Sequence, residues 1–314
     1  MIFHLNYNQN EIAEELKKVF SCKIVTTVHY FEWCLALSGN IKHVKCLLER
    51  KKNVIINDNE KLLIEEFNKE KTHFNNVDHI ICLSENAFKI LTTLYKVNQK
   101  KITIINNGLA DNMCIQNKVN LRLKYMIPDI PIILFVGRIE KIKGLLYALR
   151  AFKIVLNKFP LCHFIIAGDG DFIKLLKECE DIWMKVSLTG LIEKDKLNDL
   201  YSIANIGVMP SFHEQCSYVA IEMMMHGIPL IASTSTGLCE MVVNNVTGLQ
   251  VPVIEYTEKA EIDCSLLAKK LLYLLQHPAK TKKMGINSRI RYLKMYSSEI
   301  FRINMLKFYQ SLYQ

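Results

Sequence analysis

Short apolar runs alternate with longer amphipathic segments along almost the whole chain of 314 residues. The apolar runs have the length of buried strands and predict strands at residues 2–6, 23–29, 79–83, 101–105, 132–136, 162–167, 186–188, 206–209 and 229–232. Between them, apolar positions at helical spacing predict helices at residues 10–20, 40–50, 58–75, 84–95, 145–159, 172–179, 193–204 and 218–226. Strands that alternate with helices are typical of parallel sheets covered by helices, so we predict an α/β fold.

The same pattern divides the chain into two halves. Between residues 109 and 129 the apolar period is lost and the segment is polar, with Pro128 at its end and Pro131 just beyond. Such a segment is the best candidate for a linker. We therefore predict one domain over residues 1–128 and a second over residues 129–295. The chain is helical from about Ser265 to its end, and we expect the last helix, residues 296–314, to pack back on the first domain.

Composition narrows the class of protein. Half of the residues are hydrophobic and 23% are charged, so the chain can bury sizeable cores. No apolar run approaches the ~20 residues that a membrane span needs. The 10 cysteines are scattered singly, without a Cys-x-x-Cys pair or a cluster with histidine. This usage argues against a zinc site or a disulfide framework and for a reducing, cytoplasmic location.

The formal net charge of +9 is open to three interpretations. Solvated, lysine-rich helix faces explain it most simply. A basic face is also compatible with this charge. Such a face could bind anionic lipid at the inner side of a membrane, as in a peripheral association, or a phosphorylated substrate. Binding of nucleic acid is disfavoured, because the lysines are spread over many helices and form no arginine-rich patch interleaved with aromatic residues.

Two glutamates eight positions apart, Glu214 and Glu222, mark the most informative stretch of the sequence. Glu214 follows a predicted loop, whereas Glu222 lies in an apolar helical run that ends at Gly227. A carboxylate in apolar surroundings needs partners, and the hydroxyl groups of a ribose or a sugar are natural donors to one. The structural alternative is a solvated loop glutamate and a helix glutamate with a salt-bridge partner.

Further candidates follow the predicted strands, whose carboxyl ends bind ligands in open parallel sheets. Arg138 and Lys143 place two cations near the end of one strand, where a guanidinium fork and an ammonium group suit a diphosphate. Ser217 stands at a predicted helix N-terminus, which attracts anions. A surface turn with solvated cations and a plain serine cap are the alternatives. The glycine-rich turns nearby are Gly137, Gly168-Asp169-Gly170 and Gly190.

Together these groups resemble the family 4 retaining glycosyltransferases. The resemblance is close over residues 130–255 and looser before them, where Thr27-Val28-His29 and Asn106-Asn107-Gly108 look like the family's first domain. The stretch 213–227 looks like a Bacteroidetes-type subgroup. The motifs that carry the resemblance are Val136-Gly137-Arg138, Lys143-Gly144, Gly168-Asp169-Gly170, Gly190, Glu214-x7-Glu222, Gly227-Ile228-Pro229, Gly237 with Glu240, and Thr247-Gly248.

The resemblance implies the GT-B fold, in which two Rossmann-like domains face a cleft. It also implies a UDP- or GDP-sugar donor, no metal or other cofactor, and an acceptor that is a glycan, a lipid-linked group or a peptide. Transfer would retain the anomeric configuration by front-side substitution. Arg138 and Lys143 would hold the diphosphate, Glu214 the transferred sugar and Glu222 the ribose. His29 would lie across the cleft near the sugar. The other positions implied in donor binding are Gly137, Gly168, Asp169, Gly190, Leu191, Ser217, Tyr218 and Val219.

The sequence departs from the family pattern at several points. Gln215 and Ser217 replace a common proline and glycine, and Thr236-Gly237 replaces a glycine pair. Family members open with a strand and a glycine-rich loop before the segment that resembles Phe3-His4-Leu5, so we expect about 70 to 100 residues of the first domain to be absent. The alternative function is therefore an impaired remnant that binds nucleotide or acts as a partner protein. The glutamate pair and the two cations argue against a related epimerase, and no pyridoxal-binding lysine pattern indicates a phosphorylase.

Overall fold

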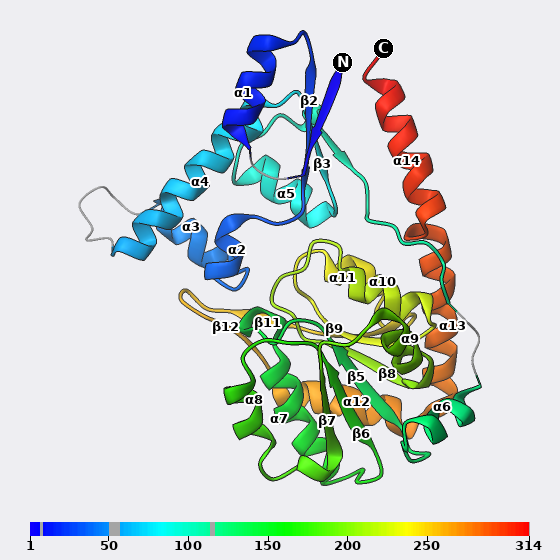
Figure 1. The fold of residues 1–314 in the computed structure, drawn as a ribbon. Helices are drawn as coiled ribbons and strands as arrows, with labels where there is room; N and C mark the ends of the chain where they lie inside the picture. The colour runs from blue at the N-terminus through cyan, green and yellow to red at the C-terminus, as the bar shows by residue number, and fades with distance from the viewer. Residues whose placement is uncertain (7–8, 50–56, 114–116, 314) are drawn as a thin grey trace.

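The computed structural model describes residues 1–6, 9–49, 57–113 and 117–313, and they form two halves that lie one above the other (Figure 1). The upper half is built on a parallel sheet with the strand order β1-β2-β3-β4. Its strands are β1 (Ile2–Leu5), β2 (Lys23–Val28), β3 (His79–Cys82) and β4 (Ile102–Ile104). Its helices are α1 (Asn10–Val19), α2 (Glu32–Ala36), α3 (Ile41–Glu49), α4 (Asp58–Asn76) and α5 (Glu85–Thr93). Stacked aromatic rings, among them Phe31, Phe67 and Tyr95, fill the core beneath these helices.

The lower half is built on a six-stranded parallel sheet with the order β10-β9-β8-β5-β6-β7. Its strands are β5 (Ile132–Val136), β6 (His163–Ala167), β7 (Val186–Gly190), β8 (Ile206–Met209), β9 (Leu230–Ser233) and β10 (Gly248–Val251). Its helices are α7 (Leu145–Leu156), α8 (Phe172–Cys179), α9 (Lys194–Ile203), α10 (Tyr218–Met225), α11 (Leu238–Met241), α12 (Cys264–Gln276) and α13 (Pro278–Met295). Because nearly every strand residue is buried, separate apolar cores lie on the two faces of this sheet.

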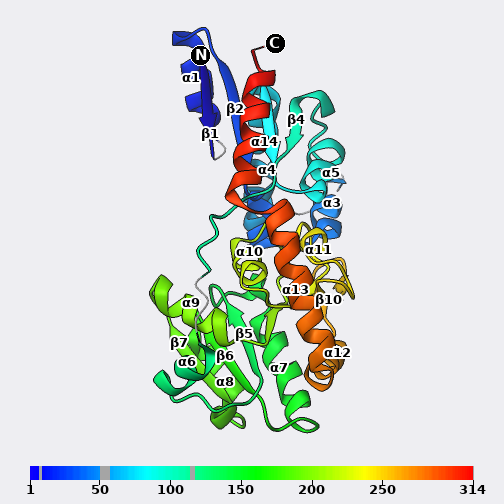
Figure 2. The same cartoon turned by 90° about the vertical axis from the view of Figure 1, so that its right-hand side faces the viewer.

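The last helix, α14 (Ser298–Ser311), returns to the upper half. Figure 2 shows α13 and α14 as a nearly continuous column that joins the two halves. Two hydrogen bonds fix the start of α14 to the chain that leaves the first sheet. Leu109 N donates to Tyr296 O at 2.9 Å, and Ser298 N donates to Leu109 O at 2.7 Å. The apolar face of α14 covers the second face of the first sheet through Val25, Ile81, Ile105, Phe308 and Leu312.

Two further contacts tie the halves together. The Glu240 carboxylate of α11 accepts hydrogen bonds from the backbone N–H groups of Glu85 and Asn86, at 2.8 and 2.7 Å. It thereby caps the positive end of α5 across the interface. On the other side, Asn40 Nδ2 donates to carbonyl groups of the hairpin formed by β11 (Val253–Glu255) and β12 (Ala260–Ile262).

Every predicted strand and helix is present within three residues of its predicted bounds; residue 50, the predicted end of one helix, lies outside the described residues. The segment predicted as an aperiodic linker, residues 109–129, runs between the strands of the two sheets but contains the helix α6 (Lys118–Lys124). Asn117 caps this helix, and the side chain of its Leu121 is buried. Several short elements were not predicted, because elements this short show no clear period. They are the helices α2 and α11, the strand β10 and the hairpin β11–β12.

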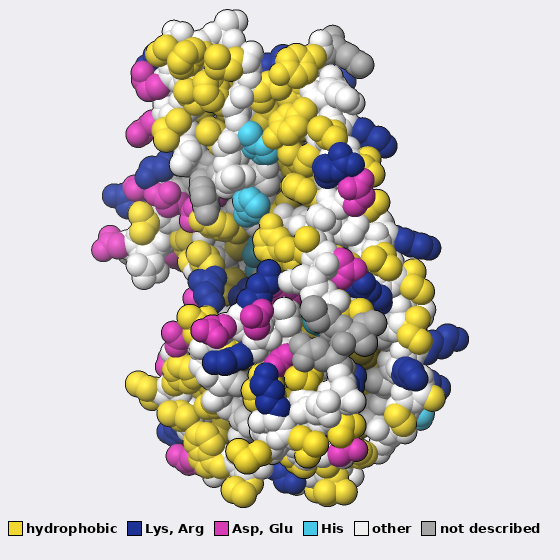
Figure 3. Space-filling model, turned by 45° about the vertical axis from the view of Figure 1, so that its right-hand side comes forward, with side chains coloured by type: hydrophobic (Ala, Val, Ile, Leu, Met, Phe, Trp, Pro, Cys, Tyr) yellow, Lys and Arg dark blue, Asp and Glu magenta, His cyan; other side chains and the backbone are white. Residues whose placement is uncertain are grey.

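The surface adds two observations. On the face shown in Figure 3, Lys and Arg side chains are scattered singly over both halves and form no continuous patch. Across the described ranges, no helix combines the length and the apolar character that a bilayer crossing requires.

Candidate functional site

A pocket of about 360 Å³ lies at the carboxyl ends of β5 and β8. These strands are neighbours, and the chain continues from β5 to β6 and β7 on one side and from β8 to β9 and β10 on the other. Such a reversal of strand order opens the crevice in which parallel sheets bind ligands. Side chains from the upper half, His29 after β2 and Asn107 after β4, complete the wall.

Most of the predicted site residues line this pocket. They come from three segments that are far apart in the sequence: the end of β2, the turn between β5 and α7, and the turn between β8 and α10. These residues are His29, Gly137, Arg138, Lys143, Glu214, Ser217, Tyr218 and Val219.

The other predicted residues do not line the pocket. Gly137 N donates to Ala167 O and Gly168 N donates to Gly190 O, each at 3.0 Å, so the turns after β5, β6 and β7 form one hydrogen-bonded row. Asp169 continues this row, because its carbonyl oxygen accepts from Ile139 N at 2.7 Å. The remaining two residues are Leu191, which is 84% exposed, and Glu222.

Close backbone packing explains why glycine stands in the turn after β6. Gly168 has a φ of 150°, and a Cβ atom there would lie 1.8 Å from the carbonyl oxygen of Gly137. A side chain at this position would therefore push the two turns apart. The Arg138 turn keeps its place beside the pocket because residue 168 has no side chain.

A partly buried ion pair lines the pocket. Lys143 Nζ lies 2.6 Å from Glu214 Oε1, and the two side chains are 20% and 12% exposed. Gly144, with a φ of 67°, lets the chain turn into α7 directly after Lys143, and a Cβ atom there would lie 1.9 Å from Pro210 O. An ammonium group and a carboxylate so close together can grip two different parts of one polar ligand. Arg138, by contrast, is exposed and pairs with Glu140 at 2.8 Å.

The turn before α10 is held from both halves of the molecule. Glu214 N donates to Thr236 Oγ1 at 2.9 Å, which fixes the turn to the loop after β9. From the upper half, Ser84 Oγ donates to Gln215 Oε1 at 2.9 Å. Ser217 caps α10, and its Oγ accepts from Ala220 N at 3.4 Å. The first N–H groups of α10 are thus placed at the pocket wall, where they favour an anion.

Glu222 lies one helical turn further along α10 and faces α9. Its Oε2 accepts a hydrogen bond from Tyr201 OH at 2.7 Å. Tyr201 is 2% exposed, and burial together with the Glu222 charge raises the pKa of its hydroxyl well above the ordinary value. This pair supplies a partner to the glutamate that the sequence placed in apolar surroundings.

Two histidines lie near the ion pair. His29 lines the pocket, and burial lowers the pKa of its ring. His213 precedes Glu214 and is 7% exposed, and neither of its ring nitrogens has a hydrogen-bond partner among the described residues. Burial, aided by the nearby Lys143 charge, lowers the pKa of His213 to about 4, so its ring is neutral near pH 7.

Several pocket residues were not predicted as ligand contacts. Asn107 Nδ2 donates to Cys216 O at 3.0 Å and so closes the pocket from the upper half. The motif Asn106-Asn107-Gly108 was a signal for this residue, but its partner is distant in sequence. The others are Leu83, Phe135, Val136, Met209, Ser211, Gln215 and Cys216. In the part of the chain that the structure describes, no group of three His, Cys, Asp or Glu side chains is placed to hold a metal ion.

Known proteins are similar to the part of the chain that supplies most of the pocket residues. Residues 130–277 match the family described as glycosyl transferases group 1. An uncharacterized glycosyltransferase of Methanocaldococcus jannaschii is 30% identical over 181 residues, which are 55% of this chain and 46% of that protein. The chain spans about half the length of the curated relatives that it matches.

Solved structures match almost the whole chain. Sucrose-phosphate synthase from Thermosynechococcus elongatus has a TM-score of 0.78 at 24% identity, with 99% of this chain and 73% of that chain covered. Anabaena HepE in complex with UDP-glucose has a TM-score of 0.77 at 14% identity, with 99% of this chain and 78% of that chain covered. These likenesses confirm the predicted GT-B fold.

Proposed function

We propose that this protein is a retaining glycosyltransferase of family 4 that moves a sugar from a UDP- or GDP-sugar to an acceptor hydroxyl group. The observation that carries the proposal is the Lys143–Glu214 pair, which lies at the switch point of the second sheet beside the N-terminus of α10. The match of residues 130–277 to group 1 glycosyl transferases supports it. The UDP and UDP-glucose complexes of HepE support a nucleotide-sugar donor.

The cationic side of the pocket suits the diphosphate. Lys143 Nζ and the N–H groups of α10 provide fixed positive charge. The exposed Arg138 side chain can add a guanidinium fork in exchange for its contact with Glu140. Negative charge grows on the diphosphate as its bond to the anomeric carbon breaks, and preplaced donors stabilise that charge. These groups need no metal ion for this task, so we propose a metal-independent reaction.

Glu214 suits the transferred sugar. In our proposal its free oxygen accepts a hydrogen bond from a sugar hydroxyl, while its second oxygen keeps Lys143 in place. The acceptor oxygen forms its bond to the anomeric carbon on the face that the diphosphate leaves, and its proton passes to the departing phosphate. His29, as a neutral ring on the opposite wall, contacts the sugar.

The nucleoside lies outside the small pocket in our proposal. Glu222, positioned by Tyr201, accepts from the ribose hydroxyls. The base lies along Gly190 and Leu191, next to the turn at Gly168 and Asp169. The nine cysteines that the structure describes are unpaired, which supports the cytoplasmic location that we propose.

A thermal-shift screen with UDP, GDP, ADP and their glucose conjugates tests the proposal. A ligand at a hundred times its Kd stabilises the folded state by about 2.7 kcal/mol, so we expect the preferred nucleotide to raise the Tm by about 5 °C or more. The same nucleotide sugar should then release free nucleoside diphosphate on incubation. A chain that binds no member of the panel contradicts the proposal, and binding without release favours a nucleotide-binding remnant.

A further inference from the structure

The helix α13 concentrates positive charge on one element. Its 18 residues include six Lys or Arg side chains and no Asp or Glu, whereas the whole chain has 40 basic and 31 acidic residues. The shorter helix α6 has three basic side chains and no acidic one. Figure 1 shows both helices on the right-hand side of the lower half, and residues of both line one cavity. This side of the molecule is therefore rich in positive charge.

The two arginines of α13 face inward and have structural partners. Arg289 donates to Met225 O at 2.7 Å and pairs with Asp111. Arg291 donates to two carbonyl groups at the end of α11, at 2.7 and 2.8 Å. The lysines differ, because Lys282, Lys283 and Lys294 are exposed and have no ion-pair partner among the described residues. Their charge is available to a partner outside the chain.

Aliphatic side chains are exposed between these lysines. Ile286, Ile290 and Leu293 are 55%, 44% and 46% exposed. Steps of three and four residues place them on one face of the helix. Water solvates lysine well, but exposed aliphatic surface has an unfavourable hydration free energy. We call this surface the outer face of α13, and its residues are Lys282, Lys283, Ile286, Ile290, Leu293 and Lys294.

A cavity of about 730 Å³ lies between the outer face of α13 and α6. Lys282, Ile286 and Ile290 line it together with Lys118 at the start of α6, and none of the described lining residues is an Asp or Glu. Partial desolvation and the nearby charges of Arg122 and Lys282 lower the pKa of Lys118. These cations therefore repel one another, and an anionic group between them would relieve the repulsion.

We propose that the outer face of α13 binds the surface of an anionic lipid bilayer, with lipid phosphate groups at Lys118 and Lys282. An anionic bilayer attracts lysines, and aliphatic side chains between them enter the boundary between headgroups and acyl chains. A soluble polyanion would pair with the lysines but leave the three aliphatic side chains in water. A bilayer accommodates both kinds of side chain. The inference does not depend on the proposed function.

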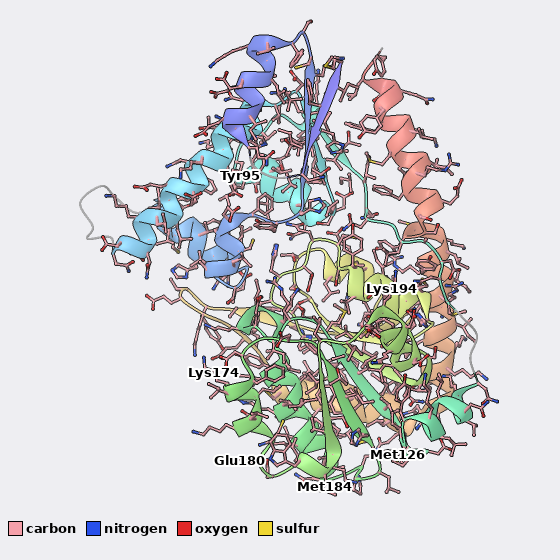
Figure 4. All side chains as sticks on the ribbon, in the orientation of Figure 1. Tyr95, Met126, Lys174, Glu180, Met184 and Lys194 are labelled. Atoms are coloured by element: carbon pink, nitrogen blue, oxygen red, sulfur yellow. The ribbon has the colours of Figure 1, made fainter. Side chains whose placement is uncertain are left out.

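The helix α8 provides an internal control. It also exposes two lysines, Lys174 and Lys177, and two aliphatic side chains, Ile173 and Leu176. Its segment differs in carrying the carboxylates of Asp171, Glu178, Glu180 and Asp181. Figure 4 labels Lys174 beside α8, on the side of the lower half opposite α13. The inference predicts no bilayer contact there, so Lys174→Gln/Lys177→Gln is the matched control variant.

Co-sedimentation of the full chain with lipid vesicles at low ionic strength tests the inference. Vesicles of phosphatidylcholine are compared with vesicles of phosphatidylcholine and phosphatidylglycerol in equal amounts. The first variant, Lys282→Gln/Lys283→Gln, removes two charges of the outer face of α13. The second, Ile286→Gln/Leu293→Gln, removes two of its aliphatic side chains and keeps its charge. Equal thermal midpoints of all proteins show that the substitutions leave the fold intact.

We expect the wild type to bind the anionic vesicles and not the neutral ones. A lysine near an anionic surface contributes about five-fold to binding, so the first variant should bind about 25-fold more weakly. The second should lose at least about ten-fold, because its side chains no longer enter the bilayer boundary. The α8 control should bind as the wild type does. Failure of the wild type to prefer anionic vesicles, an equal loss in the α8 control, or unchanged affinity in either variant overturns the inference.

Discussion

Two spaces open at the carboxyl ends of parallel strands in this molecule, and they are built in different ways. The switch-point pocket is shaped by backbone: glycine turns pack against one another, and an ion pair and a helix N-terminus lie between them. The second space, an acidic cavity, is shaped by side chains on α1, α2 and α4, among them Glu11, Glu32 and Glu65. Backbone packing holds the polar groups of the switch-point pocket in fixed positions, which suits the stabilisation of charge that develops during a reaction. The acidic cavity distributes negative charge over a wide space.

The largest effect is expected for Lys143→Ala. Loss of one preplaced charge that faces a developing anion typically costs about 10²–10³ in turnover, so we expect kcat to fall by that factor with a smaller change in KM. Lys141→Ala is the matched control, because Lys141 is exposed two positions away and does not line the pocket. Steady-state release of nucleoside diphosphate measures both variants. Equal turnover of Lys143→Ala and wild type would remove this lysine from the mechanism.

Gly168→Ala tests whether the switch-point pocket depends on backbone packing. The added Cβ atom would meet Gly137 O at 1.8 Å, so we expect a loss of about 3 kcal/mol in stability from overpacking and backbone strain. Gly190→Ala is the comparison, because that residue has a φ of 66° but no atom within 4 Å of a Cβ. Its cost should be about 1 kcal/mol. Chemical denaturation that gives both variants the same midpoint would contradict the packing argument.

Glu222→Ala tests whether Glu222 binds the ribose of the nucleotide. We expect about ten-fold weaker binding of UDP as well as UDP-glucose, because the ribose is common to both. Tyr201→Phe, which removes only the hydrogen bond to Glu222, should have a smaller effect in the same direction. Calorimetry gives both affinities. A loss of UDP-glucose affinity with unchanged UDP affinity would assign Glu222 to the sugar.

The pH dependence of stability should have contributions from both spaces. His213 beside the pocket and His73 in the cavity wall each have a pKa lowered from 6.5 to about 4, chiefly by burial. The unfolded chain then binds more protons than the folded chain between these values, so stability falls as the pH drops through this window. Each ring should cost about 1 kcal/mol between pH 7 and pH 5.5.

Chemical denaturation of the wild type, His213→Gln and His73→Gln at pH 7 and pH 5.5 measures how much each ring contributes to the pH dependence of stability. Each variant should reduce it. A slope that neither substitution alters would show that folding does not lower the pKa of either ring.

The two spaces also differ in how far the sequence predicts them. Gly137 and Gly168 stand directly after strands whose apolar patterns are clear, and Glu214 lies in the turn that follows another such strand. Their common position at one sheet edge therefore follows from the topology of parallel sheets. The acidic cavity was not predicted, because its carboxylates lie on elements that only the tertiary structure brings together. Asn107 and Gln215 were not predicted for the same reason, because their hydrogen-bond partners lie more than a hundred residues away in the sequence. The helix α6 was missed for a local reason, because a short polar helix with one buried leucine has the sequence pattern of a linker.

The central claim is that the switch-point pocket binds a nucleotide sugar, and titration calorimetry with Gln215→Glu tests it most directly. Glutamate keeps an acceptor for Ser84 and places a negative charge in the pocket wall beside Glu214. We expect at least about ten-fold weaker binding of UDP-glucose than in the wild type, because the new charge repels the diphosphate. The cavity variant Glu11→Gln/Glu65→Gln should bind UDP-glucose as the wild type does. An unchanged Kd for Gln215→Glu would place the donor elsewhere in the molecule and contradict the account.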